Sequence, residues 1–159
     1  MALSKDYTAN KVYKLLKQVC DGYKLNYNSD DQRRTINFDV KGDHLDVSHK
    51  VVVHENLELV YVLSTMPFKA QEPYANDLAQ AANLINSYLA VGSMDFNVKT
   101  NQVVFRIASN YTEMEMTKEA AAALILYTYS TVNKYNNYLH QVATGKITLN
   151  KFAAMMEGE

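Results

Sequence analysis

The region from Glu72 to His140 constrains the fold most, because its hydrophobic period changes twice. Apolar residues first recur at helical spacing, and Gly92 ends that pattern. Residues 94–107 then alternate between apolar and polar around a turn at Thr100–Asn101, as in a β-hairpin. A second, longer helical pattern follows Thr117, which is a suitable N-cap. Two long helices on either side of a strand pair predict an α+β protein.

Three further segments with a period of two precede this region and predict an antiparallel meander of three to four strands. They are Arg34–Lys41, His44–Val53 and Leu57–Leu63, after a short strand near Lys24–Asn28. Gly42-Asp43 fits a two-residue hairpin loop between the first two. The face expected to point into the core carries Ile36, Phe38, Val40, Leu45, Val47, His49, Val51, Val53, Leu57, Leu59, Tyr61 and Leu63.

An amphipathic N-terminal helix is predicted from Thr8, its N-cap, to Gly22. The segment Ser64–Pro73 holds both prolines and is therefore expected to be the crossover to the helix that starts at Glu72. We expect an antiparallel sheet, a meander plus a second hairpin, with the N-terminal, crossover and long C-terminal helices packed on one side. Residues 1–145 would form a single domain, and residues 146–159 a short helix or tail that docks on it or on a partner.

Composition and charge exclude several classes of protein. With 16 Lys and Arg against 17 Asp and Glu, the net charge is −1, so no overall field attracts nucleic acid or an anionic membrane. The longest apolar run, Ala120–Tyr127, is far shorter than the ~20 residues that span a bilayer. Cys20 is the only cysteine, which excludes an intramolecular disulfide and favours a reducing compartment. We therefore expect a cytoplasmic protein with neither nucleic acid nor membrane as partner.

No motif in the chain carries chemistry. His44, His49 and His54 are spaced by five, and the outer two would lie about 30 Å apart along a strand, too far to share an ion. The remaining candidate, Arg106, is expected at an edge or on the outer face of the second hairpin, with binding of an acidic group as the alternative. We expect no catalytic residue, no cofactor and no metal, and hence not an enzyme.

The first half of the long C-terminal helix is apolar almost all round. Ile125 and Tyr129 lie away from the stripe that would cover the sheet, which consists of Ala120, Leu124, Tyr127, Thr131, Tyr135, Tyr138 and Val142. A helix with two apolar sides usually has two neighbours, here the core and either a second subunit or the returning tail. The tail repeats apolar residues at helical spacing. The predicted partner or dimer surface therefore comprises Ile125, Tyr129, Leu149, Phe152 and Met156.

Several short segments share their spacing with a known family. They are Val40-Lys41-Gly42-Asp43, Asn83-Leu84-Ile85-Asn86, Gly92-Ser93-Met94-Asp95-Phe96-Asn97, Val103-Val104-Phe105-Arg106, and Met116-Thr117 before a long helix that contains Tyr135. In these the chain resembles the bacterial YbjN-like family, which has the fold of type III secretion chaperones, over roughly residues 24–142. The resemblance implies a dimer-prone, non-enzymatic domain that binds proteins or peptides as a regulator or chaperone, and it supplies no catalytic residues. The segment after Gly145 does not match the family.

Two functions follow as hypotheses. The first is a non-catalytic protein-interaction module, chaperone-like or regulatory, that binds a peptide or protein partner as a homodimer. The alternative is a small-molecule-binding protein or enzyme with a cleft between the meander and the crossover helix, near Tyr61, Met66 and Phe68.

Overall fold

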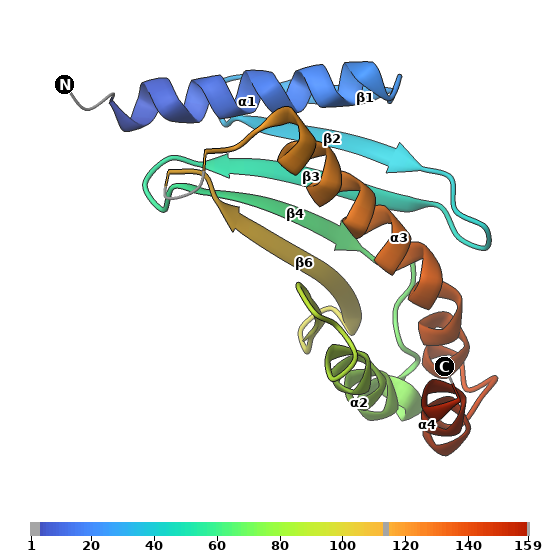
Figure 1. The fold of residues 1–159 in the computed structure, drawn as a ribbon. Helices are drawn as coiled ribbons and strands as arrows, with labels where there is room; N and C mark the ends of the chain where they lie inside the picture. Colours follow the sequence, from blue (N-terminus) through green and yellow to red (C-terminus); the bar gives the residue numbers. More distant parts are fainter. Residues whose placement is uncertain (1–3, 113–114, 159) are drawn as a thin grey trace.

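The chain forms one six-stranded antiparallel sheet with helices on one side (Figure 1). This computed structural model describes residues 4–112 and 115–158. Along the sheet the strand order is β1-β2-β3-β4-β6-β5. The elements are α1 (Lys5–Gly22), β1 (Tyr27–Asp30), β2 (Thr35–Val40), β3 (Val47–His54), β4 (Leu59–Thr65), η1 (Glu72–Tyr74), α2 (Ala75–Asn86), β5 (Ser93–Asn97), β6 (Gln102–Asn110), α3 (Lys118–Ala143) and α4 (Leu149–Glu157).

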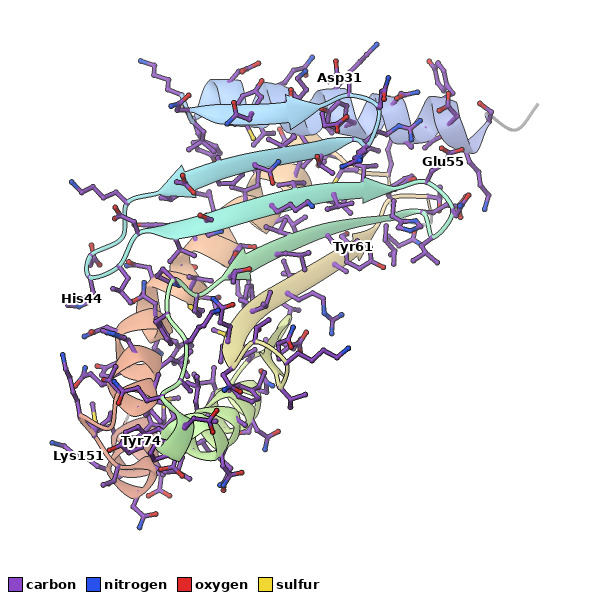
Figure 2. The ribbon with its side chains drawn as sticks, turned by 180° about the vertical axis from the view of Figure 1, so that it is seen from behind. Asp31, His44, Glu55, Tyr61, Tyr74 and Lys151 are labelled. Carbon is purple, nitrogen blue, oxygen red and sulfur yellow. The ribbon has the colours of Figure 1, made fainter. Side chains whose placement is uncertain are left out.

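The helices are arranged so that one face of the sheet is covered and the other is open. In Figure 1, α1 runs along the β1–β2 end, α3 crosses the sheet diagonally, and α2 and α4 lie together at the far end. Seen from behind in Figure 2, no helix of the described chain lies over the opposite face. The fold class predicted from the sequence is confirmed. Within the described residues, no helix combines the length and apolar composition needed to cross a membrane.

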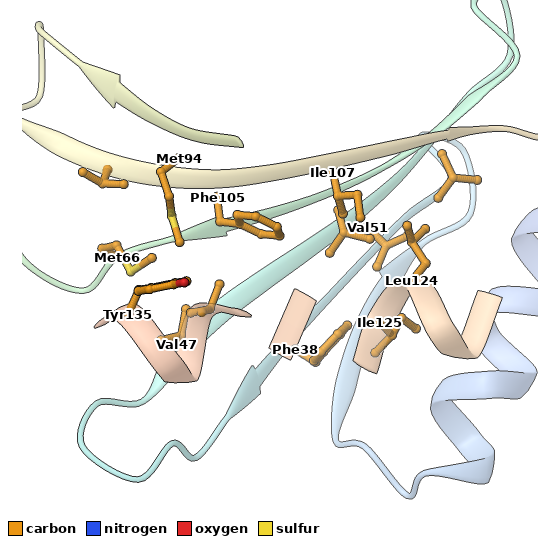
Figure 3. Close-up of a cluster of buried hydrophobic side chains, with 14 of the residues drawn as sticks. Phe38, Val47, Val51, Met66, Met94, Phe105, Ile107, Leu124, Ile125 and Tyr135 are labelled. Carbon is orange, nitrogen blue, oxygen red and sulfur yellow. The ribbon is translucent and has the colours of Figure 1, made fainter. Parts of the chain in front are cut away.

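The core fills the space between the covered face of the sheet and α3 (Figure 3). Residues of β3 alternate between buried and accessible as predicted, with Val47, His49, Val51 and Val53 facing inward. Phe105 on β6 is completely buried among them. Period-two strands and an amphipathic helix thus close a single hydrophobic interior, which is the main favourable term in the folding of such a domain.

The face predicted to be buried in the segment Leu57–Leu63, which corresponds to β4, is wrong. Leu59, Tyr61 and Leu63 lie on the open face, where they are half-buried, whereas Val60 and Val62 point into the core. In the register of the sheet Val62 lies opposite Val51, and directly opposed residues share a face. Because β4 is apolar at both alternating sets of positions, its pattern alone could not decide which set is buried. Figure 2 shows Tyr61 on the open face.

The predicted two-residue loop at Gly42-Asp43 is also wrong. β2 ends at Val40 and β3 begins at Val47, so a six-residue segment, the 41–46 loop, joins them. This loop contacts α3 through Asn133. The Asn133 Oδ1 atom accepts a hydrogen bond from the Asp43 backbone N–H at 2.9 Å, and its Nδ2 donates to the Asp43 carboxylate at 2.7 Å. Contacts between residues so far apart in sequence favour a longer loop than the local turn signal suggests.

Two helices begin elsewhere than expected. Ser4, and not Thr8, caps α1, since its Oγ accepts a hydrogen bond from the Tyr7 N–H at 3.2 Å. The crossover helix is shorter than predicted at both ends, because Glu72–Tyr74 forms a 3₁₀ turn that leads into α2 and α2 ends at Asn86, before Gly92.

The C-terminal helix α4 packs on its own chain. It contacts α2 and α3, and its Phe152 and Met156 side chains are buried there. Gly145 turns the chain between α3 and α4 with a φ of +69°, and a Cβ at this position would lie 2.2 Å from the Tyr74 ring. Glycine therefore permits both the turn and the close approach of the tail to η1.

Candidate functional site

The five residues of the predicted partner surface fall into two places. Leu149, Phe152 and Met156 belong to α4, where Leu149 is half-buried and the other two are buried. Ile125 and Tyr129 lie together on α3, Ile125 with only 6% of its surface exposed and Tyr129 half-buried. Ile125, Phe152 and Met156 thus already pack within the chain in this structure, and Figure 3 shows Ile125 next to Phe38 in the interior. Tyr129 is the more accessible of the α3 pair.

Ile125 and Tyr129 line an apolar groove between the covered face of the sheet, the segment that follows α1, and the first half of α3. The groove has a volume of about 190 Å³. Its rim is formed by Tyr23 and Leu126, which are 44% and 48% exposed. The lining is almost wholly apolar and consists of Tyr23, Leu25, Phe38, Val40, His49, Val62, Ile125, Leu126, Thr128 and Tyr129.

Local structure explains how these side chains meet. Ile125 and Tyr129 are four residues apart on α3 and therefore share a flank of the helix. On the other side, α1 ends at Gly22 and the chain turns through Lys24, which has a φ of +54°. The Leu25 N–H then donates to the Cys20 carbonyl at 3.0 Å, which closes the helix end and fixes Leu25 against the sheet.

His49 supplies the groove with its one buried imidazole. The Nδ1 atom lies 2.6 Å from the Ser64 hydroxyl, and the ring stacks on Phe38 with centroids 5.2 Å apart. Burial lowers the pKa of His49 to about 4, so the ring is neutral at physiological pH. Ser64 is completely buried beneath it, out of reach of a substrate. The pair is therefore a satisfied polar contact in the core and has no geometry for nucleophilic catalysis.

The other candidates for chemistry are dispersed. His44 lies in the 41–46 loop and His54 at the end of β3, and the described residues hold no group of three or more His, Cys, Asp or Glu side chains that could bind a metal. Burial raises the pKa of the Cys20 thiol to about 11, which keeps it protonated and unreactive. Arg106 is exposed on the open face, where its Nε donates to Asp95 at 2.8 Å.

The residues of the alternative cleft do not converge. Tyr61 lies on the open face of the sheet, whereas Met66 is completely buried in the core. Phe68 packs against the His140 ring, with centroids 5.1 Å apart. The cleft predicted near these three side chains is therefore not formed by them.

Two of the larger hollows, each of about 440 Å³, are more polar. One lies on the open face and is lined mainly by amide, hydroxyl and charged side chains, such as Asn28, Asn37 and Lys50. The other lies beside α1, where Lys11 and Lys118 line it together with Glu115. The smaller groove is the one that unites the predicted α3 residues with an apolar lining.

Sequence reasoning missed Tyr23, Leu25 and Leu126. Leu126 belongs to the uninterrupted apolar run 120–127. A helix that is apolar on every side must expose some of these side chains, so this run was a signal for the exposure of Leu126. Tyr23 and Leu25 follow directly on the helix stop at Gly22, where two apolar residues in a polar turn were a further signal.

Comparisons with known proteins agree with this architecture. No protein-family model matches the chain, and no curated protein matches it in sequence. The crystal structure of the ExsC–ExsE complex contains a chain that superposes with a TM-score of 0.59 at 15% identity, covering 81% of this chain and 93% of that one. YbjN from E. coli superposes with a TM-score of 0.57 at 13% identity, covering 79% and 91%. The chain therefore has the α+β fold that its sequence resemblance implied, YbjN-like and similar to type III secretion chaperones.

Proposed function

We propose that this protein is a non-catalytic interaction module, chaperone-like or regulatory, that binds a peptide or protein partner as a homodimer. The observation that carries the proposal is the apolar groove between the sheet, the segment that follows α1 and the first half of α3, whose rim residues Tyr23 and Leu126 remain half exposed. Covering such side chains is favourable by roughly 25 cal/mol for each Å² removed from water.

The dimensions and polarity of the groove indicate what it can hold. Its volume of about 190 Å³ is below the roughly 300–1,000 Å³ typical of sites for whole cofactors or drug-sized ligands. It suits instead a large apolar side chain of a partner, which is how hot spots of protein interfaces are built. The neutral His49 adds no charge that a substrate anion would need.

The structural neighbours support the same class of function. ExsC was crystallised in complex with ExsE, and YbjN is described as a candidate transcription regulator. These descriptions belong to those proteins, and they favour a partner-binding role for a chain with the same fold. A cytoplasmic location is part of the proposal, and the single, buried Cys20 is compatible with a reducing compartment.

The edge strand β5 supports the dimer. Within residues 4–112 and 115–158 it pairs with β6 alone, and the residues around it include the exposed apolar side chains Tyr88, Val91 and Val98. An unpaired edge beside apolar surface favours association with a second copy. Light scattering should give twice the 18.0 kDa of one chain. The double variant Val91→Asp/Val98→Asp should have the mass of a monomer, whereas the control variant Leu57→Asp, in the β3–β4 loop, should have the mass of a dimer. A monomeric wild type would contradict the dimer.

A peptide selection tests the groove directly. Random short peptides displayed on phage are selected against the full chain, and the affinity of the most enriched peptide is measured by fluorescence polarisation. Leu126→Asp places a carboxylate on the rim and should weaken binding by at least about tenfold, as loss of an apolar anchor does. The matched control is Leu57→Asp, an exposed leucine outside the groove. Failure to enrich any peptide, or equal binding by the Leu126→Asp variant, would refute the proposal.

A further inference from the structure

The apolar groove continues beneath the 41–46 loop. A tight hollow between that loop and α3 shares Val40, His49 and Tyr129 with the groove, so the two spaces adjoin along the same flank of α3. The hollow extends toward the C-terminal half of the helix, where Asn133 and Asn136 border it. The loop therefore covers a closed hollow that lies next to the groove.

The loop is held on α3 by contacts at its surface. Asn133 accepts from the Asp43 N–H at 2.9 Å and donates to the Asp43 carboxylate at 2.7 Å. A Cβ at Gly42 would lie 2.3 Å from the Leu45 carbonyl oxygen and 2.9 Å from the Asn133 Oδ1 atom, so glycine is needed mainly for the tight turn of the loop itself. Both bonds are exposed to water, which can replace them at little net cost in free energy. The polar contacts of the loop with α3 are therefore weak, and its apolar contact with the hollow is made by the half-buried Leu45.

Asn136 lies under the loop with an acceptor that the fold does not use. Its side chain is completely buried, and its Nδ2 donates to the Leu45 carbonyl at 3.4 Å. Among the described residues, its Oδ1 has no hydrogen-bond partner. The space beside it is too tight for a water molecule while the loop is in place. Buried acceptors without a donor are rare because they carry the full cost of desolvation, so this one calls for an explanation.

We propose that Asn136 forms a polar subsite of the groove, which accepts a hydrogen bond from a partner peptide when the 41–46 loop moves away from α3. The donor is a backbone N–H of an extended segment, and an apolar side chain of the same segment occupies the space beside Ile125 and Tyr129. A helical segment is disfavoured because its backbone N–H groups are already bonded beyond the first turn. This inference rests on the proposed peptide-binding function and specifies the conformation and chemistry of the partner.

The first test removes the acceptor. Asn136→Leu is expected to weaken binding of the enriched phage-derived peptide by at least about tenfold, the size of effect produced by losing a buried hydrogen bond. The unliganded variant should remain folded by circular dichroism. The matched control is Asn137→Leu, the next residue along α3, which does not line the groove.

The second test weakens the attachment of the loop to α3 in one variant and strengthens it in another. Asn133→Ala removes both bonds to Asp43 and should tighten peptide binding several-fold, with faster hydrogen exchange of the loop amides. Asp43→Cys/Asn133→Cys holds the loop on α3 through a disulfide and should weaken binding by about tenfold until a reductant is added.

The two proposals fail in different ways. One outcome is a peptide that requires Leu126 and still binds the Asn136→Leu variant and the oxidised double variant with affinities within about twofold of wild type. This result would refute the Asn136 subsite but not the groove. A peptide that binds the Leu126→Asp variant as tightly as wild type overturns the groove itself.

Discussion

The two halves of α3 use their apolar surface differently. In the C-terminal half, Tyr135, Leu139 and Val142 are buried, and α2 and α4 pack beside the helix. In the N-terminal half, Leu126 stays half exposed beside the groove. The same helix is therefore covered by α2 and α4 at one end, whereas at the other end it packs on α1 and keeps Leu126 at the surface beside the groove. Surplus apolar surface on a helix thus indicates a second neighbour, but it does not say whether that neighbour belongs to the same chain.

The largest expected effect concerns the enclosed half. Phe152→Ala should lower the free energy of unfolding by about 3–5 kcal/mol, because it removes a completely buried ring and leaves a cavity under α4. Urea denaturation measures this. Met155→Ala, on the 38% exposed side of the same helix, is the control and should cost well under about 1 kcal/mol. Equal effects would mean that α4 does not contribute to the enclosed half.

Acid should affect the open half through His49. Its pKa is about 4 when folded and 6.5 when unfolded, so protonation favours the unfolded chain. The stabilising contribution is complete above pH 6.5 and is lost as the pH falls to 4, by about 3 kcal/mol in all. Denaturation at several pH values should show this slope, and His49→Leu should flatten it. His44→Ala, in the exposed loop, should retain it; an unchanged slope in His49→Leu would exclude His49 as its origin.

The connection between α3 and α4 gives an intermediate effect. Gly145→Ala should destabilise the protein by about 2 kcal/mol, since the residue has a φ of +69° and an added Cβ would lie 2.2 Å from the Tyr74 ring. Thermal melts compare it with Gly22→Ala, where an added Cβ meets nothing within 4 Å. If both substitutions are neutral, the tail does not need this turn to reach η1.

The smallest expected effect on stability is at the groove rim, and it tests most directly whether the two halves of α3 differ. Leu126→Asp should change the free energy of unfolding by less than about 0.5 kcal/mol, because this side chain is already half exposed. The same variant should lose peptide binding. A large loss of stability would show that Leu126 belongs to the core, and that the two halves of α3 do not differ as described.

Local pattern was sufficient where a segment faces a single interior. The alternation in β3 predicted its buried residues Val47 and Val51, and Thr117 predicted the start of α3, where its side chain accepts a hydrogen bond from the Ala120 N–H at 3.1 Å. Beyond Gly145, where a short helix or tail was expected, α4 spans Leu149–Glu157, and the Thr148 side chain accepts a hydrogen bond from the Lys151 N–H at 3.2 Å. In each case the period or the cap depends only on neighbouring residues.

By itself, the sequence therefore determined the element types, the α+β class and the presence of surplus apolar surface on α3. Only the tertiary structure decided which face of β4 is buried, because both sets of alternating positions are apolar and cross-strand register chooses between them. It also decided that Tyr23 and Leu126 border one groove, and that Asn133 draws the 41–46 loop onto α3. These outcomes depend on residues distant in sequence, which no local hydrophobic period can relate.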